Sequence, residues 1–160
     1  MSQVRAVVLV VALVMTVGLP AQSQNGGRRP LAAADVDAIT QLVMLEDTRQ
    51  FDEAVLTRLL KSAHPEVRRR AVVATGRIVS PAGKALLVSA RKDDDGDIVA
   101  TVAFATGQLK DPDAVPWLSD LLMTGGTPPA IGREAAQALG KIRTPAARTV
   151  LAQYLTSAPQ

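Results

Sequence analysis

Three copies of one glycine-centred pattern constrain this chain more than any other feature. Its glycines, Gly76, Gly107 and Gly140, are separated by 31 and 33 residues. Each copy has a branched apolar residue nine positions before the glycine, Ile or Leu two positions after it, and proline five positions after it. A period of this length is typical of helical repeat proteins, whose units stack on one another to build a shared core.

Each copy also has the apolar spacing of an amphipathic helix. The apolar residues recur at i, i+4, i+7 and i+11, which is one helix face. They are Val67, Ala71, Ala74 and Ile78, then Ile98, Val102, Ala105 and Leu109, then Ile131, Ala135, Ala138 and Ile142. Small alanines in the middle favour a close neighbour, and the late glycine permits either close packing or a local bend. The following proline prevents the helix from continuing.

A shorter apolar helix is expected before each of these helices. Its residues are Val55, Leu56, Leu59 and Leu60, then Leu86, Leu87 and Ala90, then Trp117, Leu118, Leu121 and Leu122. Neither helix of a pair can bury its apolar face alone, so the pairs must stack. We therefore predict an all-α fold, a right-handed α-solenoid of antiparallel helix pairs over residues 32–157. Its expected parts are a cap helix 32–46, units 53–80, 82–111 and 113–144, and a last helix 146–157.

The first residues have the pattern of an export signal. Arg5 precedes an uncharged apolar run over residues 6–19, Pro20 interrupts it, and Ala21-Gln22-Ser23 offers small residues for cleavage. The run has about 14 residues, fewer than the roughly 20 that span a bilayer. We expect a signal peptide over 1–23, a flexible linker over 24–31 and a periplasmic or secreted protein. The alternative is anchoring to the membrane by an uncleaved N-terminal helix.

The repeats resemble a known superfamily. Pro65-Glu66-Val67-Arg68, followed by Ala71, Ala74, Gly76 and Ile78, resembles the short HEAT-like repeats related to those of phycobilisome lyases. The segment Leu45-Glu46-Asp47-Thr48-Arg49-Gln50-Phe51-Asp52 is similar to the start of bacterial HEAT-bearing proteins that continue into a cyclophilin-type prolyl isomerase domain. The first resemblance implies a fold and no single function. Arg68 becomes Val99 and Gly132 in the later copies, so a family contact through this arginine is restricted to the first.

No catalytic, metal or cofactor site is expected. His64 is the only histidine and there is no cysteine, which leaves no ligand set for zinc. The acidic stretch from Asp93 to Asp97 fails as a calcium loop, because Arg91 and Val102 occupy two of the required ligand positions. We interpret His64 as a helix-start residue and the acids as a solvated loop beside a helix N-terminus.

Basic residues supply the candidate binding site. We predict that Arg68, Arg69, Arg77 and Arg133 contact an acidic partner or a phosphate, although consecutive arginines on a helix cannot all share one face. At least one should pair with Glu66 or with an acid of the neighbouring unit. Nucleic acid is not expected, because the net charge is only +3 and aromatic residues make up only 2% of the chain.

These observations favour an interaction protein. We expect an exported, non-enzymatic scaffold that binds a protein or peptide along the faces of its longer helices. One alternative is the repeat arm of a truncated or split cyclophilin-type prolyl isomerase. A second is a lyase-like chaperone, suggested only by the shared repeat.

Overall fold

The structure is a computed structural model that describes residues 29–157, and this part of the chain is helical without a strand. The elements are α1 (Ala33–Thr48), α2 (Glu53–Leu59), α3 (Pro65–Ile78), α4 (Gly83–Ala90), α5 (Gly96–Gln108), η1 (Pro112–Ala114), α6 (Val115–Met123), α7 (Pro129–Ile142) and α8 (Pro145–Ser157). The leader expected over 1–23 lies outside the described residues, as does most of the linker expected over 24–31. No helix in the described part is both long and apolar enough to cross a membrane.

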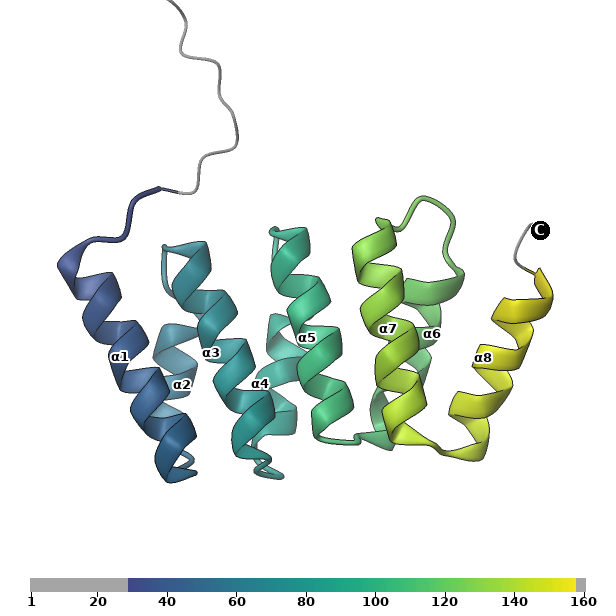
Figure 1. Ribbon diagram of the computed structural model, residues 1–160, viewed down its shortest axis with the longest axis horizontal. Coiled ribbons are helices and arrows are strands. Elements are labelled where there is room, and N and C mark those ends of the chain that lie inside the picture. The colour runs from purple at the N-terminus through teal and green to yellow at the C-terminus, as the bar shows by residue number, and fades with distance from the viewer. Residues whose placement is uncertain (1–28, 158–160) are drawn as a thin grey trace, which may run out of the picture.

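The helices form two rows. The longer helices α1, α3, α5 and α7 lie side by side in one row, and the shorter α2, α4 and α6 lie behind them (Figure 1). In the first row α1 packs on α3, α3 on α5 and α5 on α7, while α8 packs against both α6 and α7. This arrangement confirms the predicted all-α solenoid of helix pairs.

Local sequence sets where the longer helices begin. The side chains of His64 and Asp95 accept hydrogen bonds from the backbone N–H groups two residues later, at the starts of α3 and α5. Pro65 and Pro129 occupy the first turns of α3 and α7, where a missing N–H costs nothing. Pro145 begins α8, so this repeat proline starts the next helix as well as ending the previous one.

The ends of the longer helices share one register. A residue in the left-handed conformation follows each of α1, α3, α5 and α7, and such a residue commonly terminates a helix. These residues are Arg49, Val79, Lys110 and Arg143. The last three stand three positions after Gly76, Gly107 and Gly140, which aligns α1 with the repeats although it has no glycine.

Close packing explains two of the three repeat glycines. A Cβ atom on Gly76 would lie 2.7 Å from Cα of Ala105, and one on Gly107 would lie 2.7 Å from Cα of Ala138. Both distances are far inside van der Waals contact, so only glycine permits this approach. Gly140 differs, because no atom lies within 4 Å of its Cβ position.

The core consists of small and branched aliphatic side chains. Three clusters run along the solenoid, and alanines and leucines from both rows fill them. Ala71, Ala74, Ala103 and Ala105 are fully buried, as are Leu42, Leu56 and Leu118. Alanine occupies the middle of the longer helices because their axes approach too closely there for a larger side chain.

Candidate functional site

Two neighbouring pockets lie on the face of the longer helices. The first has a volume of about 320 Å³ and spans α3, α5 and α7, and we call it the α3–α5–α7 pocket. It is lined by Arg69, Val73, Arg77, Ala100, Thr101, Phe104, Ala130, Arg133 and Glu134. Three arginines and one glutamate thus surround a floor that includes valine, alanine and phenylalanine.

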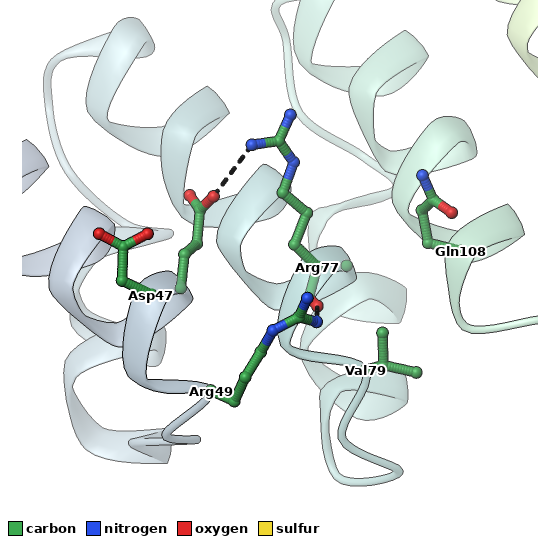
Figure 2. A pocket seen from close by; sticks show the side chains of 7 residues that line it. Asp47, Arg49, Arg77, Val79 and Gln108 are labelled. Atoms are coloured by element: carbon green, nitrogen blue, oxygen red, sulfur yellow. Dashed lines mark hydrogen bonds and ion pairs between the residues drawn. The ribbon is translucent and has the colours of Figure 1, made fainter.

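The second pocket lies beside the first, toward the ends of α1, α3 and α5. It has a volume of about 460 Å³, and we call it the α1–α3–α5 pocket. It is lined by Glu46, Asp47, Arg49, Gly76, Arg77, Val79 and Gln108. Figure 2 shows Gln108 reaching this pocket from α5, across from the residues of α1. Arg77 lines both pockets and so connects them into one groove.

Glu46 anchors the middle of this groove. Its carboxylate lies 3.2 Å from the Arg77 guanidinium, the pair marked by the dashed line in Figure 2. The same carboxylate lies 3.1 Å from the Arg70 guanidinium, and the Glu46 side chain is almost buried. Arg49 donates a hydrogen bond of 2.6 Å to the backbone carbonyl of Arg77. One acid in α1 therefore holds two arginines of α3, and of these side chains Arg77 remains half-exposed at the pocket wall.

The other two arginines of the α3–α5–α7 pocket differ in their surroundings. Arg69 donates two hydrogen bonds to Glu66, at 2.9 and 2.6 Å, and these bonds raise the pKa of its guanidinium against the opposing effect of burial. Arg133 is exposed and forms no ion pair within residues 29–157. Arg133 is therefore the cation in this pocket that a ligand can reach without displacing an acid of the described chain.

Arg68 lies away from the pocket. Its guanidinium donates to the Asp93 carboxylate at 2.8 and 2.9 Å, to Asp94 at 3.2 Å and to the carbonyl of Ser62 at 3.0 Å. The hydrogen bonds to Asp93 raise the pKa of Arg68. Of the four predicted binding residues, the structure brings Arg69, Arg77 and Arg133 together, whereas Arg68 fixes the loop between α4 and α5.

His64 and the acidic stretch have structural partners. The His64 ring is buried, with Nδ1 accepting from the Glu66 N–H at 3.1 Å and Nε2 lying 2.7 Å from the carbonyl of Arg29. Asp95 caps α5, and Asp93 accepts from both Arg68 and the Asp95 N–H. Within the described residues, no group of three or more His, Cys, Asp or Glu side chains is placed to hold a metal ion.

Sequence reasoning missed Phe104, Thr101 and Glu134 as pocket residues. Phe104 could have been noticed in the sequence, because it is one of only two phenylalanines. In the structure its ring lies 4.6 Å from the Lys141 ammonium in a cation–π contact. The remaining two are ordinary polar surface residues of a helix. No feature of the sequence distinguished them from their neighbours.

Comparison with known proteins places the fold in a family. A family model for HEAT repeats matches residues 85–160. The chain is a HEAT-like repeat protein. The narrower resemblance of this HEAT-like protein to the arms of cyclophilin-type prolyl isomerases stays a prediction.

Several enzymes are similar to this HEAT-like protein over part of their length. Deoxyhypusine hydroxylase of Arabidopsis thaliana is 31% identical over 110 residues, 68% of this chain and 35% of the relative. The Homo sapiens enzyme is 31% identical over 108 residues, 67% of this chain and 36% of the relative. The Bos taurus enzyme is 32% identical over 110 residues, with 68% and 36% covered. The chain spans about a third of the length of these relatives.

These relatives correct the functional prediction made from sequence. We predicted a non-enzymatic scaffold, and this is wrong, because the similar proteins are hydroxylases and point to an enzyme. The error has a physical cause. The repeat pattern reports buried, mostly apolar positions, and those positions determine stacking without specifying what the exposed face binds.

Proposed function

We propose that this HEAT-like protein is part of a hydroxylase, and that it supplies the surface on which the substrate is bound. The similarity to three deoxyhypusine hydroxylases supports the enzymatic part. The observation that carries the binding part is the convergence of Arg69, Arg77 and Arg133 on one pocket. The ligand that fits is a peptide segment of a protein substrate bearing a carboxylate.

The pocket suits such a segment in size and chemistry. Its volume of about 320 Å³ accommodates one or two side chains of an extended peptide. Arg133 offers a planar fork of donors, which binds a carboxylate through two hydrogen bonds. The Phe104 ring and Val73 provide apolar surface for the aliphatic part of the same side chain.

Arg77 can join this interaction at modest cost. It is paired with Glu46, but Glu46 also contacts Arg70 at 3.1 Å. When Arg77 turns toward a bound carboxylate, Glu46 retains Arg70, so no buried charge is left without a partner. Arg69 remains paired with Glu66, so this pair adds no net charge to the pocket.

The described residues do not fit the oxygen chemistry of a hydroxylase. Hydroxylation with molecular oxygen requires a bound metal or an organic redox cofactor. The usual non-haem iron site needs two histidines and a carboxylate. The one histidine here is buried as a helix cap, and residues 29–157 contain no cluster of metal-binding side chains. We therefore assign substrate binding, and no step of the oxidation, to these residues.

Peptide binding tests the assigned pocket. The purified full-length chain is titrated with a fluorescent peptide of alternating Glu and Ala, and with a matched peptide in which Gln replaces Glu. We expect tighter binding of the acidic peptide, and a loss of at least about tenfold in Arg133→Ala, since a charge-assisted hydrogen bond contributes about 1.5–3 kcal/mol. Arg58→Ala is the matched control, because Arg58 is an exposed arginine of α2 that donates to Gln41. Equal affinity for both peptides would refute the site.

A turnover assay tests the enzymatic part separately. A peptide bearing deoxyhypusine within an acidic sequence is incubated with a soluble extract of the source cells, with and without the purified chain. Mass spectrometry then measures the gain of one oxygen atom. We expect more product when the chain is present, less with Arg133→Ala, and full yield with Arg58→Ala. Product that is independent of the chain would contradict a hydroxylase role.

Export is a separate part of the proposal. The basic residue Arg5, the apolar run 6–19 and the small residues before Gln24 support a cleaved signal and a periplasmic or secreted location. Fractionation of expressing cells, followed by the intact mass of the chain, tests this. A mature chain that starts near residue 24 outside the cytoplasm is expected. A full-length chain in the membrane fraction would support the uncleaved anchor, and one in the cytoplasm would refute export.

A further inference from the structure

The repeat register places four side chains in one row across the longer helices. Asp47, Arg77, Gln108 and Lys141 each stand two positions before the left-handed residue that ends α1, α3, α5 or α7. The first three line the α1–α3–α5 pocket. Lys141 lies over the ring of Phe104, which lines the neighbouring α3–α5–α7 pocket. The row therefore follows the groove that the two pockets form.

Gln108 brings an unused amide group to this groove. Arg77 is paired with Glu46, and Lys141 contacts Phe104. The side chain of Gln108 is half-buried, and within residues 29–157 its amide forms no hydrogen bond. In Figure 2 this amide stands across the pocket from Arg77 and the residues of α1. Its carbonyl oxygen and its NH₂ group are therefore available to a ligand in the pocket.

The charges that line the α1–α3–α5 pocket are balanced. Glu46 is paired with Arg77, while Asp47 and Arg49 form no ion pair within the part of the chain that the structure describes. These last two residues have opposite signs, so the lining carries no net charge. In the neighbouring pocket, Arg133 offers a fork of donors to a carboxylate. A ligand that spans both pockets is expected to place its charged group at Arg133 and a polar, uncharged group beside Gln108.

The main chain of a peptide is a polar, uncharged ligand that fits these groups. Each peptide group offers one N–H donor and one C=O acceptor, and the amide of Gln108 offers the complementary acceptor and donors. The pocket volume of about 460 Å³ lies within the range of ligand pockets and exceeds that of its neighbour. An extended chain presents a peptide group at every residue, so this contact does not depend on the side chains of the ligand.

One extended segment can reach from Arg133 to Gln108. Ala100 is the residue of α5 that is equivalent to Arg133, and Gln108 follows it on the same helix, about 12 Å further along the axis. Neighbouring helix axes are about 8–10 Å apart. The path from Arg133 on α7 to Gln108 on α5 is therefore diagonal and about 15 Å long. At about 3.3 Å per residue, an extended chain covers it in about four or five residues.

We propose that the α1–α3–α5 pocket binds the main chain of the substrate segment, through hydrogen bonds between the Gln108 amide and one peptide group. This inference rests on the proposed function, since the carboxylate of the same segment binds at Arg133. Gln108 then sets the register of the segment, because the peptide group that it holds lies about four or five residues from the acidic side chain. A segment with proline at that position lacks the N–H donor and is disfavoured.

Replacing single amides of the ligand by esters tests this contact. Fluorescent peptides of Ala and Ser with one Glu are titrated with the full-length chain, and each peptide has one backbone N–H replaced by an ester oxygen. We expect the ester about four or five residues from Glu, on one side of it, to weaken binding by about fivefold, the loss of one neutral hydrogen bond. Gln108→Met has a side chain of similar length without the amide. This variant should bind the all-amide peptide about fivefold more weakly and should be insensitive to that ester.

Gln153→Met is the matched control, because Gln153 is an exposed glutamine of α8 outside both pockets. It should bind every peptide as the natural chain does. Equal binding of all esters to the natural chain, or an ester effect that persists in Gln108→Met, would overturn main-chain binding while leaving the site at Arg133 intact. Failure of the proposed function looks different, because the all-amide peptide would then bind no better than its counterpart with Gln in place of Glu.

Nuclear magnetic resonance of the side-chain amides reports on the same contact in the natural chain. The signal of Gln108 is identified by its disappearance in Gln108→Met, and that of Gln153 by its disappearance in Gln153→Met. Saturation with the all-amide peptide should shift the Gln108 signal and leave the Gln153 signal in place. A Gln108 signal that does not move when the peptide is bound would overturn the proposal.

Discussion

Replacing Gly107 by alanine tests how the repeats are held together. The added Cβ atom would lie 2.7 Å from Cα of Ala138 and 2.9 Å from its Cβ. Carbon atoms pack favourably at about 3.5–4.0 Å, so α5 and α7 would have to separate by roughly 1 Å. The obstructing atoms include the backbone of α7, which cannot rotate away as a long side chain does. The strain is therefore shared along the contact between the two helices.

The size of the effect follows from comparing two glycines in equivalent places. Alanine is favoured over glycine inside a helix by about 1 kcal/mol, and this gain applies at Gly107 and Gly140 alike. Overpacking of a core contact costs about 1–3 kcal/mol, and this cost applies only at Gly107, because Gly140 has open space. The free energies of unfolding of the two variants should therefore differ by about 1–3 kcal/mol.

Thermal and urea unfolding of both variants and the natural chain measures this difference. At low protein concentration, Gly140→Ala should unfold slightly later than the natural chain, by up to about 1 kcal/mol. Gly107→Ala should unfold earlier than Gly140→Ala, with midpoints separated by roughly 4–12 °C for a fold of this size. Gly76→Ala should behave like Gly107→Ala, since its Cβ would meet Ala105 at the same distance. Equal stability of Gly107→Ala and Gly140→Ala would refute close packing as the role of the repeat glycine.

Two further predictions concern buried polar groups. His64→Ala removes the acceptor for the Glu66 N–H and the contact with the Arg29 carbonyl, and should lower stability by about 1–2 kcal/mol in thermal unfolding. His64→Asn keeps a cap and should recover most of this loss, so equal losses would contradict the capping role. For Asp93, burial would raise the carboxyl pKa, but hydrogen bonds from Arg68 and the Asp95 N–H outweigh it and hold the pKa below its ordinary value. The resulting stability is fully present above the unfolded pKa of about 3.9 and is lost as pH falls through the lower folded value. Urea midpoints between pH 7 and 2 should therefore fall less steeply in Asp93→Asn than in the natural chain, while Asp94→Asn, with a side chain 94% exposed, should resemble the natural chain. Parallel curves for Asp93→Asn and the natural chain would contradict this assignment.

The fold could be predicted from the sequence because the residues that repeat are the ones that are buried. The positions of Val67, Ile98 and Ile131 fix the inward face of each longer helix, and all three residues are buried. The sequence alone could not decide whether the repeat glycine permits close packing or a bend. Close packing and bending predict the same residue at the same place, and only the neighbouring backbone distinguishes them.

The spacing of the repeats also predicts part of the candidate site. Arg69, Ala100 and Arg133 stand two positions after the first buried residue of each copy, so stacking brings them into one row across α3, α5 and α7. The ion pair of Arg77 with Glu46 could not be predicted from the repeat spacing. Glu46 belongs to α1, which lies outside the glycine pattern, and its register appears only from the left-handed residue that ends the helix.

Most polar side chains of the described residues already have a structural role, which is why a chain that we propose to be part of an enzyme shows no evident catalytic set. Short polar side chains at helix starts are needed as caps, and buried charges need partners, so both are committed before any chemistry begins. Here His64, Asp52 and Asp95 cap helices, and Asp93 and Glu46 neutralise arginines. The groups left for a ligand lie on the outward face of the longer helices. Under the proposed function, the repeat segment contributes to a hydroxylase through the surface that it presents, and residues outside 29–157 supply the reacting groups.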